Sequence, residues 1–178
     1  MQTFTISRDP SFYQAFPDVA LTASGRLVCV FSECTHHGDR SYTRIVTVTS
    51  SDRGRTWSAK RALTEGTAGL PYYYNCPRIT VLRDGRLAVA VDRCPHGGEQ
   101  KTDGRSSVLL YFSRDEGATW EDPVVTPVVG IVPDRLLVLP NGRWILAAQH
   151  REDGYLAQFL RYSDDGGRSW SDRITVGK

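Results

Sequence analysis

The pattern Ser-x-Asp-x-Gly-x-(Thr/Ser)-Trp occurs three times along this chain of 178 residues. The copies occupy residues 50–57, 113–120 and 163–170, and three of the four tryptophans of the protein each end a copy. A single copy would carry little information. Three copies with the same spacing indicate a structural unit that repeats, and a repeat constrains the fold more strongly than local propensities do.

Each motif is preceded by the same series of short apolar runs. A proline (Pro17, Pro77 or Pro133) opens the first run, a glycine-containing turn follows, and a second and a third run lead into the motif. A fourth run follows each tryptophan. Alternating apolar residues around Arg-Asp-Gly or Pro-Asn-Gly turns predict β-hairpins. Each unit is therefore predicted to be four short strands, with the motif as the turn between the third and the fourth.

Repeated four-stranded antiparallel units of this length predict an all-β fold of the β-propeller type. We expect a single domain over residues 1–178, in which blade 1 covers about 13–65, blade 2 about 66–125 and blade 3 about 126–178. Residues 1–9, which include the run from Thr3 to Ser7, are expected to form an extra N-terminal strand. Its partner would be a blade beyond residue 178.

The motif resembles the Asp-box, or BNR repeat, of the sialidase (neuraminidase) superfamily, and the resemblance extends from about Tyr13 to Lys178. It implies a six-bladed propeller of sialidase type, of which this chain would supply the first three blades. Two copies could complete one ring, the chain could be the first half of a longer protein, or it could be an engineered half. The exposed edges and apolar flank of an open half favour self-association.

Composition excludes several other classes of protein. The net charge is +2 with both signs interspersed, so no basic block predicts nucleic-acid binding. No apolar stretch approaches the roughly 20 residues of a membrane span, and the N-terminus lacks the form of a signal peptide, which makes a cytoplasmic location the default expectation. We expect free buried cysteines, no metal site and no cofactor, since no phosphate-binding or dinucleotide-binding motif occurs.

Blade connectivity divides the candidate functional residues between two faces. The motif turns lie on one face, where turn chemistry assigns a structural role to Asp52, Trp57, Asp115, Trp120, Asp165 and Trp170. The opposite face collects polar and aromatic residues suited to binding a sugar, unless these are only a hydrated loop surface. These candidates are Glu33, His36, His37, Arg40, Tyr72, Tyr73, Tyr74, Asn75, Arg78, Asp92, Arg93, Asp134 and Arg135.

The resemblance to sialidases can be tested at individual positions. Sialidases carry a substrate-clamping arginine two residues before the proline of the first blade, and Ala15 occupies that position here. Asp39 lies where the family has its acid/base aspartate, so the resemblance implies that role; the alternative is an aspartate that pairs with Arg40 or caps a turn. The tyrosine and glutamate of the sialidase nucleophile belong to later blades.

Three functions therefore remain open for the chain. It can be part of a sialidase-like glycoside hydrolase that is incomplete or inactive as an isolated half-propeller and whose sugar is not ordinary sialic acid. It can be a non-catalytic propeller that binds a glycan or a protein through the same face. It can also be purely architectural, a half-propeller whose relevant behaviour is self-assembly.

Overall fold

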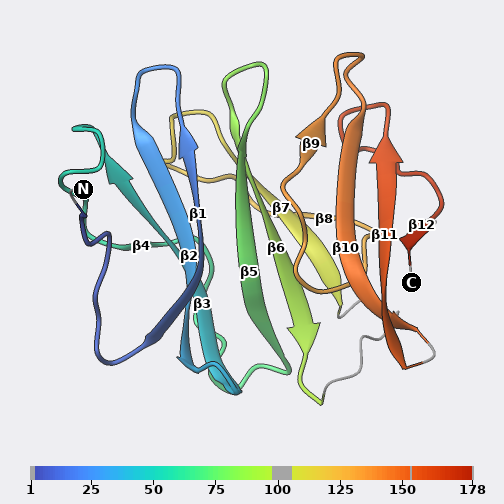
Figure 1. The fold of residues 1–178 in the computed structure, drawn as a ribbon, viewed down its shortest axis with the longest axis horizontal. Coiled ribbons are helices and arrows are strands. Elements are labelled where there is room, and N and C mark those ends of the chain that lie inside the picture. Colours follow the sequence, from blue (N-terminus) through green and yellow to red (C-terminus); the bar gives the residue numbers. More distant parts are fainter. Residues whose placement is uncertain (1–2, 98–105, 153, 178) are drawn as a thin grey trace.

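The computed structural model of the chain describes residues 3–97, 106–152 and 154–177, and in these ranges it contains strands and turns but no helix (Figure 1). Three four-stranded antiparallel sheets follow one another along the chain, as the repeats predicted. Blade 1 contains β1 (Tyr13–Leu21), β2 (Leu27–His36), β3 (Asp39–Ser50) and β4 (Arg61–Ala62). Blade 2 contains β5 (Tyr72–Val81), β6 (Leu87–Pro95), β7 (Ser107–Ser113) and β8 (Val124–Val125). Blade 3 contains β9 (Leu137–Val138), β10 (Trp144–Glu152), β11 (Tyr155–Ser163) and β12 (Ile174–Gly177).

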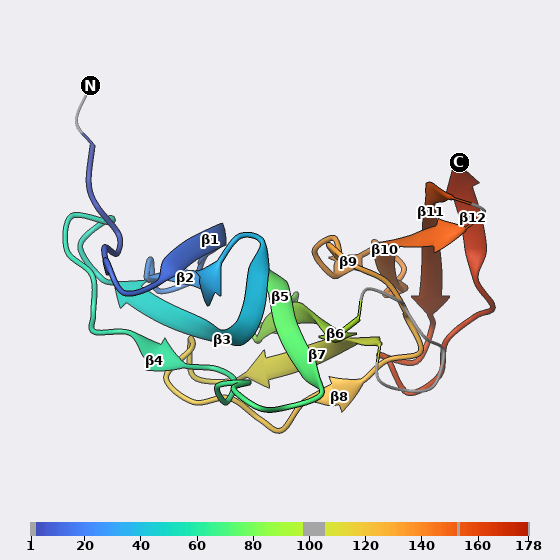
Figure 2. The same cartoon turned by 90° about the horizontal axis from the view of Figure 1, so that it is seen from below.

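The three blades lie side by side along an arc, with β1, β5 and β9 on its concave side (Figure 2). Blade 2 is covered on both faces, so β6 and β7 are buried almost throughout their length. Leu87, Val89 and Val91 of β6 face blade 1, and the alternate residues Ala88 and Ala90 face blade 3. This double burial explains why the sequence of β6 and β7 is continuously apolar rather than alternating.

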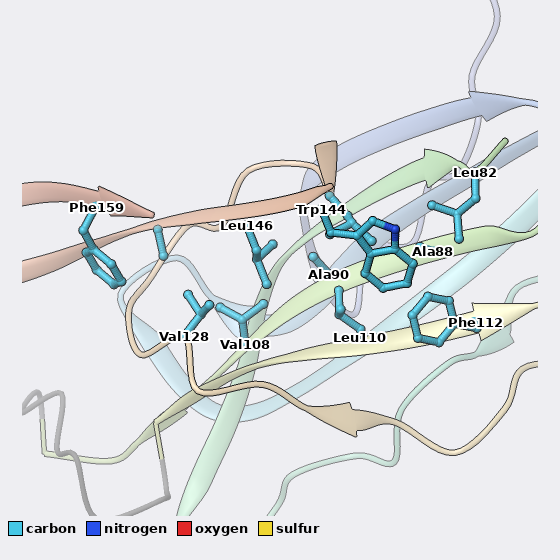
Figure 3. Close-up of a cluster of buried hydrophobic side chains, with 12 residues drawn as sticks. Leu82, Ala88, Ala90, Val108, Leu110, Phe112, Val128, Trp144, Leu146 and Phe159 are labelled. Atoms are coloured by element: carbon cyan, nitrogen blue, oxygen red, sulfur yellow. The ribbon is translucent and has the colours of Figure 1, made fainter. Parts of the chain in front are cut away.

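Bulky side chains fill the space between blades 2 and 3 (Figure 3). The rings of Phe112 and Trp144 lie 5.9 Å apart across this interface, and Leu110, Leu146 and Phe159 continue the core along it. Each fully buried side chain of this size contributes about 1.5–3 kcal/mol to the free energy of folding. Packing between sheets therefore holds neighbouring blades together, while hydrogen bonds pair the strands within each blade.

The hairpin turns and the motif turns share one face of the arc, at the top of Figure 1. Hairpins β1–β2, β5–β6 and β9–β10 turn at Gly25, Gly85 and Gly142, whose φ values of +86°, +85° and +88° require glycine. Hydrogen bonds link the two kinds of turn, because Ser24 Oγ donates to Glu116 Oε2 at 2.7 Å. The β2–β3 connection lies on the opposite face, together with the ends of β6 and β10 and the starts of β7 and β11, as the sequence predicted.

The N-terminal segment has no strand partner within the described residues, which exclude residues 1–2. Because its expected partner is a blade beyond residue 178, the extra strand stays a prediction. Thr3 to Ser7 have no strand pairing. Ile6 and Ser7 instead lie against the outer face of blade 1, where they line a cavity of about 190 Å³ with Cys29 and Phe31. In this chain the segment therefore contacts side chains on a sheet face.

The three motif turns use the same hydrogen bonds. In the first, Ser50 Oγ donates to Asp52 Oδ1 at 2.8 Å and accepts from the Gly54 amide at 2.9 Å. The Asp52 carboxylate then accepts from the amide and the hydroxyl of Thr56 at 2.9 and 2.6 Å. Hydrogen bonds from Thr56 are the main reason that the pKa of Asp52 falls to about 2. The carboxylate is therefore engaged inside its turn.

We predict that Ser50→Ala destabilises the protein, because it leaves the Gly54 amide and the Asp52 carboxylate without their shared hydroxyl partner. The expected loss in the free energy of unfolding is about 1–3 kcal/mol, measured by urea denaturation. The neighbouring Ser51 is exposed, so Ser51→Ala is the matched control and should change stability by less than about 0.5 kcal/mol. Equal effects of the two substitutions would contradict the role of Ser50.

Candidate functional site

Each innermost chain segment contains a residue with positive φ directly before its proline. These residues are Phe16 (φ +55°), Cys76 (φ +23°) and Val132 (φ +49°). The β1–β2 and β5–β6 registers shift at these points, between Ala15 and Asp18 and between Asn75 and Arg78. Positive φ is costly for such side chains, and bulges of this kind re-aim the side chains that follow. Three strained bulges at equivalent positions single out this part of the fold.

The residues after the three bulges meet in a cavity of about 550 Å³ on the concave side of the arc. We call it the hub pocket. Its charged lining residues are Asp18, Arg78, Asp134 and Arg135, and Phe16 and Ile145 are among its apolar walls. A second hollow of about 440 Å³ continues along β1, β5 and β9, and Arg135 lines both. A pocket of this size with a few polar groups among apolar walls suits a small ligand.

Asp18 connects all three blades in the hub pocket. Its carboxylate accepts from Arg135 Nε at 2.9 Å and from Arg135 Nη2, and Oδ2 also accepts from the Ile79 amide at 3.0 Å. Asp18 was not among the residues proposed from the sequence. It directly follows the proline of the first repeat, as Arg78 and Asp134 follow the prolines of the second and third, and alignment of the repeats would have identified it.

An aromatic group lies beside the hub pocket, at the β2–β3 end of blade 1. The His37 ring lies 5.6 Å from the Tyr13 ring and 6.3 Å from the Phe16 ring, and His36 lies 6.0 Å from Tyr13. The Arg40 guanidinium stands over Phe16 at 5.8 Å. We call Tyr13, Phe16, His36, His37 and Arg40 the aromatic platform. Because Phe16 also lines the hub pocket, the aromatic platform and the pocket form one continuous surface. The structure therefore brings His36, His37 and Arg40, which were proposed from the sequence, into one cluster around Tyr13 and Phe16.

Asp39 lies at the exposed start of β3, where its side chain stabilises a turn. Its Oδ1 accepts from the Ser41 amide at 2.8 Å, and this hydrogen bond is the main cause of a lowered pKa. Arg40 does not pair with it, since Arg40 Nη1 donates to Cys34 Sγ at 2.7 Å. A general acid needs a raised pKa, so these properties favour the turn-capping alternative.

The three consecutive tyrosines of β5 have different environments. The Tyr72 hydroxyl donates to Glu65 Oε1 at 2.9 Å. The Tyr73 ring is tilted by 46° against the His96 ring, with centroids 5.4 Å apart, and Tyr74 is buried between blades 1 and 2. Burial raises the pKa of Tyr72 and of Tyr74 to about 12. The Arg93 guanidinium lies over Tyr72 at 5.4 Å. Burial raises the pKa of Tyr73 further still. The three tyrosines are therefore neutral aromatic rings at ordinary pH.

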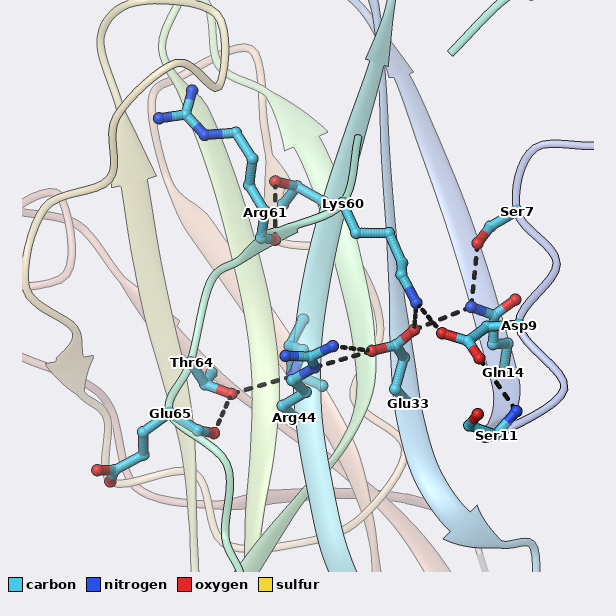
Figure 4. Close-up of polar contacts among 12 residues, drawn as sticks. Ser7, Asp9, Ser11, Gln14, Glu33, Arg44, Lys60, Arg61, Thr64 and Glu65 are labelled. Atoms are coloured by element: carbon cyan, nitrogen blue, oxygen red, sulfur yellow. Dashed lines mark hydrogen bonds and ion pairs between the residues drawn. The ribbon is translucent and has the colours of Figure 1, made fainter. Parts of the chain in front are cut away.

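Glu33 was expected to contact a ligand, and the structure contradicts this. Its carboxylate is fully buried and accepts from Gln14 Nε2 at 2.9 Å, from Arg44 Nε at 2.8 Å and from Lys60 Nζ (Figure 4). Lys60 also donates to Asp9 Oδ2 at 2.7 Å. Burial raises the pKa of Glu33, but the hydrogen bonds from Lys60, Gln14 and Arg44 outweigh it and hold the pKa below its ordinary value. Glu33 therefore joins the strands of blade 1 to the N-terminal segment.

Asp92 also lies out of reach of a ligand, although the sequence suggested otherwise. The side chain is fully buried in β6, and its Oδ2 accepts from the Val132 amide at 3.2 Å. Among the residues that the structure describes, its other oxygen has no hydrogen-bond partner, and the same is true of Asn75 Oδ1. Burial raises the pKa of Asp92 to about 6. Asp92 thus holds the Val132 bulge, from which Asp134 enters the hub pocket.

The described residues contain no group of three or more histidine, cysteine, aspartate or glutamate side chains able to hold a metal ion. All four cysteines are free and buried, in agreement with their spacing. No helix long and apolar enough to cross a membrane occurs in the described ranges.

We predict that Asp92→Asn stabilises the protein increasingly as the pH rises from about 4 to 6. The buried carboxyl group of the folded protein binds its proton more tightly than the ordinary group of pKa 3.8 in the unfolded chain, so its ionisation lowers stability over this window. Urea denaturation of both proteins at several pH values should give a stability difference that grows to about pH 6 and then becomes constant. A difference that is independent of pH would contradict the buried, ionisable state of Asp92.

Comparisons with known proteins agree with this architecture. A family model described as a BNR repeat-like domain matches residues 14–126 and again residues 74–176. A sialidase from Clostridium perfringens is 24% identical over 188 residues, covering 90% of this chain and 49% of that protein. The chain therefore spans about half the length of this curated relative.

Two solved structures illustrate the likeness in fold. The Hadza microbial sialidase Hz136 has a TM-score of 0.70 at 18% identity, over 88% of this chain and 36% of that one. A Penicillium chrysogenum α-L-arabinanase complexed with arabinobiose has a TM-score of 0.69 at 19% identity, over 98% of this chain and 54% of that one. Together with its three antiparallel blades and repeated turns, these matches establish that the chain belongs to the BNR repeat-like family of sialidase-type β-propellers.

Proposed function

We propose that this chain forms the sugar-recognition part of a glycoside-hydrolase-like propeller and binds a glycan across the hub pocket and the aromatic platform. One observation carries the proposal: Phe16 belongs to both surfaces, so rings and charged hydrogen-bonding groups lie on one continuous surface. Aromatic rings stack on the apolar faces of sugars, and guanidinium and carboxylate groups bond their hydroxyls. Both kinds of group are within reach of one ligand here.

The hub pocket supports binding by this chain more strongly than catalysis by this chain alone. Glycoside hydrolysis commonly uses two carboxyl groups on either side of the scissile bond. Of the two carboxylates lining the pocket, Asp18 is occupied by Arg135 and the Ile79 amide, whereas Asp134 is exposed. Under this proposal Asp134 is the pocket carboxylate available to a sugar. Hydrolysis would need a second catalytic group from outside the hub pocket.

The fold itself does not choose the sugar. The neighbours include sialidases as well as an α-L-arabinanase complexed with arabinobiose, at identities that support only a likeness in fold. Sequence position favours a departure from ordinary sialic acid, since Ala15 stands where the family has a clamping arginine. The class of sugar that binds is therefore expected to depend on the side chains of the hub pocket.

We predict that Arg78→Gln weakens glycan binding about tenfold to a hundredfold, because a charged hydrogen-bond donor in the pocket is lost. Affinity for a panel of methyl glycosides is measured by titration calorimetry. Arg55→Gln is the matched control: Arg55 is exposed in the first motif turn and does not line the hub pocket, so its loss should leave affinity unchanged. Equal affinities of the Arg78 variant and wild type, or the absence of any glycan binding, would contradict the proposed function.

An assembly function is supported by a separate observation on the outer face of blade 3. Phe159 faces blade 2, so its neighbour in the sequence, Leu160, and the paired Ile174 face outward. Leu156 shares this outward face, and both Leu156 and Ile174 are 44% exposed. By contrast, the apolar faces that blades 1 and 3 turn toward blade 2 are covered by blade 2. We infer that the outer face of blade 3 packs against a second copy of the chain.

This assembly predicts a dimer whose mass by light scattering is twice the 19.9 kDa of one chain. Ile174→Lys should shift the protein to a monomer, because it places a charge in the apolar contact. Val125→Lys is the matched control, since Val125 is a 58% exposed valine on β8 of blade 2, away from this face. A wild-type protein that stays monomeric over the whole concentration range would overturn the assembly proposal.

A further inference from the structure

The guanidinium of Arg135 in the hub pocket already has an anionic partner. Arg135 donates to both oxygens of Asp18, from Nε at 2.9 Å and from Nη2. This is the two-point geometry by which an arginine would also hold the carboxylate of a ligand. The edge of the Arg135 guanidinium best suited to an acidic sugar is therefore occupied by a group of the protein itself.

Displacing Asp18 from this pair would be unfavourable. The Asp18 side chain is only 10% exposed, whereas that of Arg135 is 57% exposed. Asp18 is also fixed by the Ile79 amide, which donates to Oδ2 at 3.0 Å. A ligand carboxylate that took the Arg135 edge would leave a poorly solvated aspartate with only the hydrogen bonds of the Val19 and Ile79 amides, and a charge without a counter-ion in such a position is costly.

The remaining charges of the hub pocket do not favour an anion either. Arg78 and Arg135 bring two positive charges, and Asp18 and Asp134 bring two negative ones, so the pocket is balanced. Arg78 Nη1 donates to the carbonyl of Pro77 at 2.9 Å, which ties part of that guanidinium to the bulge. The exposed Asp134 carboxylate would repel an acidic sugar and accept hydrogen bonds from hydroxyls.

From these observations we propose that the hub pocket binds uncharged sugars and that Asp18 excludes carboxylated ones by occupying Arg135. The inference rests on the proposed function, because it names the class of sugar taken by the same pocket. Asp18 acts as a specificity-determining residue: it holds Arg135 in place for hydroxyl groups and neutralises its charge. Substituting Asp18 should therefore change the choice of ligand, and not merely the strength of binding.

The test uses pairs of probes that differ only in one carboxylate. Methyl galactoside and methyl galacturonide form one pair, and methyl glucoside and methyl glucuronide form another. Titration calorimetry at low salt gives the ratio of affinities within each pair for wild type and for Asp18→Asn. Asparagine keeps a side-chain oxygen that can accept from the Ile79 amide and removes the charge that holds Arg135.

Wild type is expected to prefer the uncharged sugar by about tenfold or more, the range of one charged hydrogen bond. In Asp18→Asn the preference for the uncharged sugar should fall by at least about tenfold, because the variant binds the galacturonide or glucuronide more tightly than wild type does. Adding Arg135→Gln to that variant should remove the gain. Asp134→Asn leaves the tie between blades intact and should raise uronide affinity by a smaller factor, which keeps the inference testable if Asp18→Asn folds poorly.

A matched control is available in a pair of residues that do not line the hub pocket. Arg143 donates to both oxygens of Asp164, from Nε at 2.7 Å and from Nη2 at 2.8 Å, so Asp164→Asn removes the same kind of pair away from the hub pocket. Its sugar preference should equal that of wild type. A shift as large as that of Asp18→Asn would show a general effect of charge and overturn the inference.

The remaining outcomes separate the two proposals. If wild type binds the uronide as well as the uncharged sugar, and Asp18→Asn leaves the ratio unchanged, the specificity role is overturned while glycan binding stands. If wild type binds no sugar and Asp18→Asn binds only the uronide, Asp18 does mask Arg135 but the proposed function fails. If neither protein binds any probe, both proposals are overturned.

Discussion

Blade 2 is buried on both faces, and the rest of the structure depends on this arrangement. Alternate residues of β6 and β7 supply apolar side chains to two different interfaces, one with blade 1 and one with blade 3. Short strands such as β4, β8 and β9 could not form stable sheets alone, because so few hydrogen bonds do not offset the entropy of ordering them. The sheets persist because their faces are packed against one another, and this packing brings the three innermost segments to one concave surface.

The hub pocket is a consequence of that packing. Each innermost segment bends at a residue of positive φ before a proline, and the residues after the bulges point to a common space. Two hydrogen-bonded carboxylates hold the bulges in place: Asp92 accepts from the Val132 amide, and Asp18 joins Ile79 to Arg135. The same groups that tie the blades together therefore also set the positions and charges of the pocket residues.

Local chemistry accounts for the parts that were predictable from the sequence. The motif turns depend on contacts within seven or eight consecutive residues, so a serine, an aspartate and a glycine at the right spacing were enough to locate them. The same holds for the glycine turns of the hairpins, where positive φ is a local requirement. Glu33 and Asp92 were misjudged because a loop-like, polar stretch of sequence does not reveal which of its carboxylates a neighbouring strand will bury. Asp39 is exposed as expected, yet its hydrogen bond to Ser41 gives it the properties of a turn residue.

The sequence by itself determined the all-β repeat, the strand order within each blade and the separation of the motif turns from the opposite face. These follow from residue periodicity and turn chemistry, which act over a few residues. Only the tertiary structure decided which polar residues share a site. Asp18 and Arg135 are 117 positions apart in the chain, and their pairing depends on how far each blade rotates relative to the previous one. That rotation is set by the summed packing of many side chains between sheets, and no short stretch of sequence contains it.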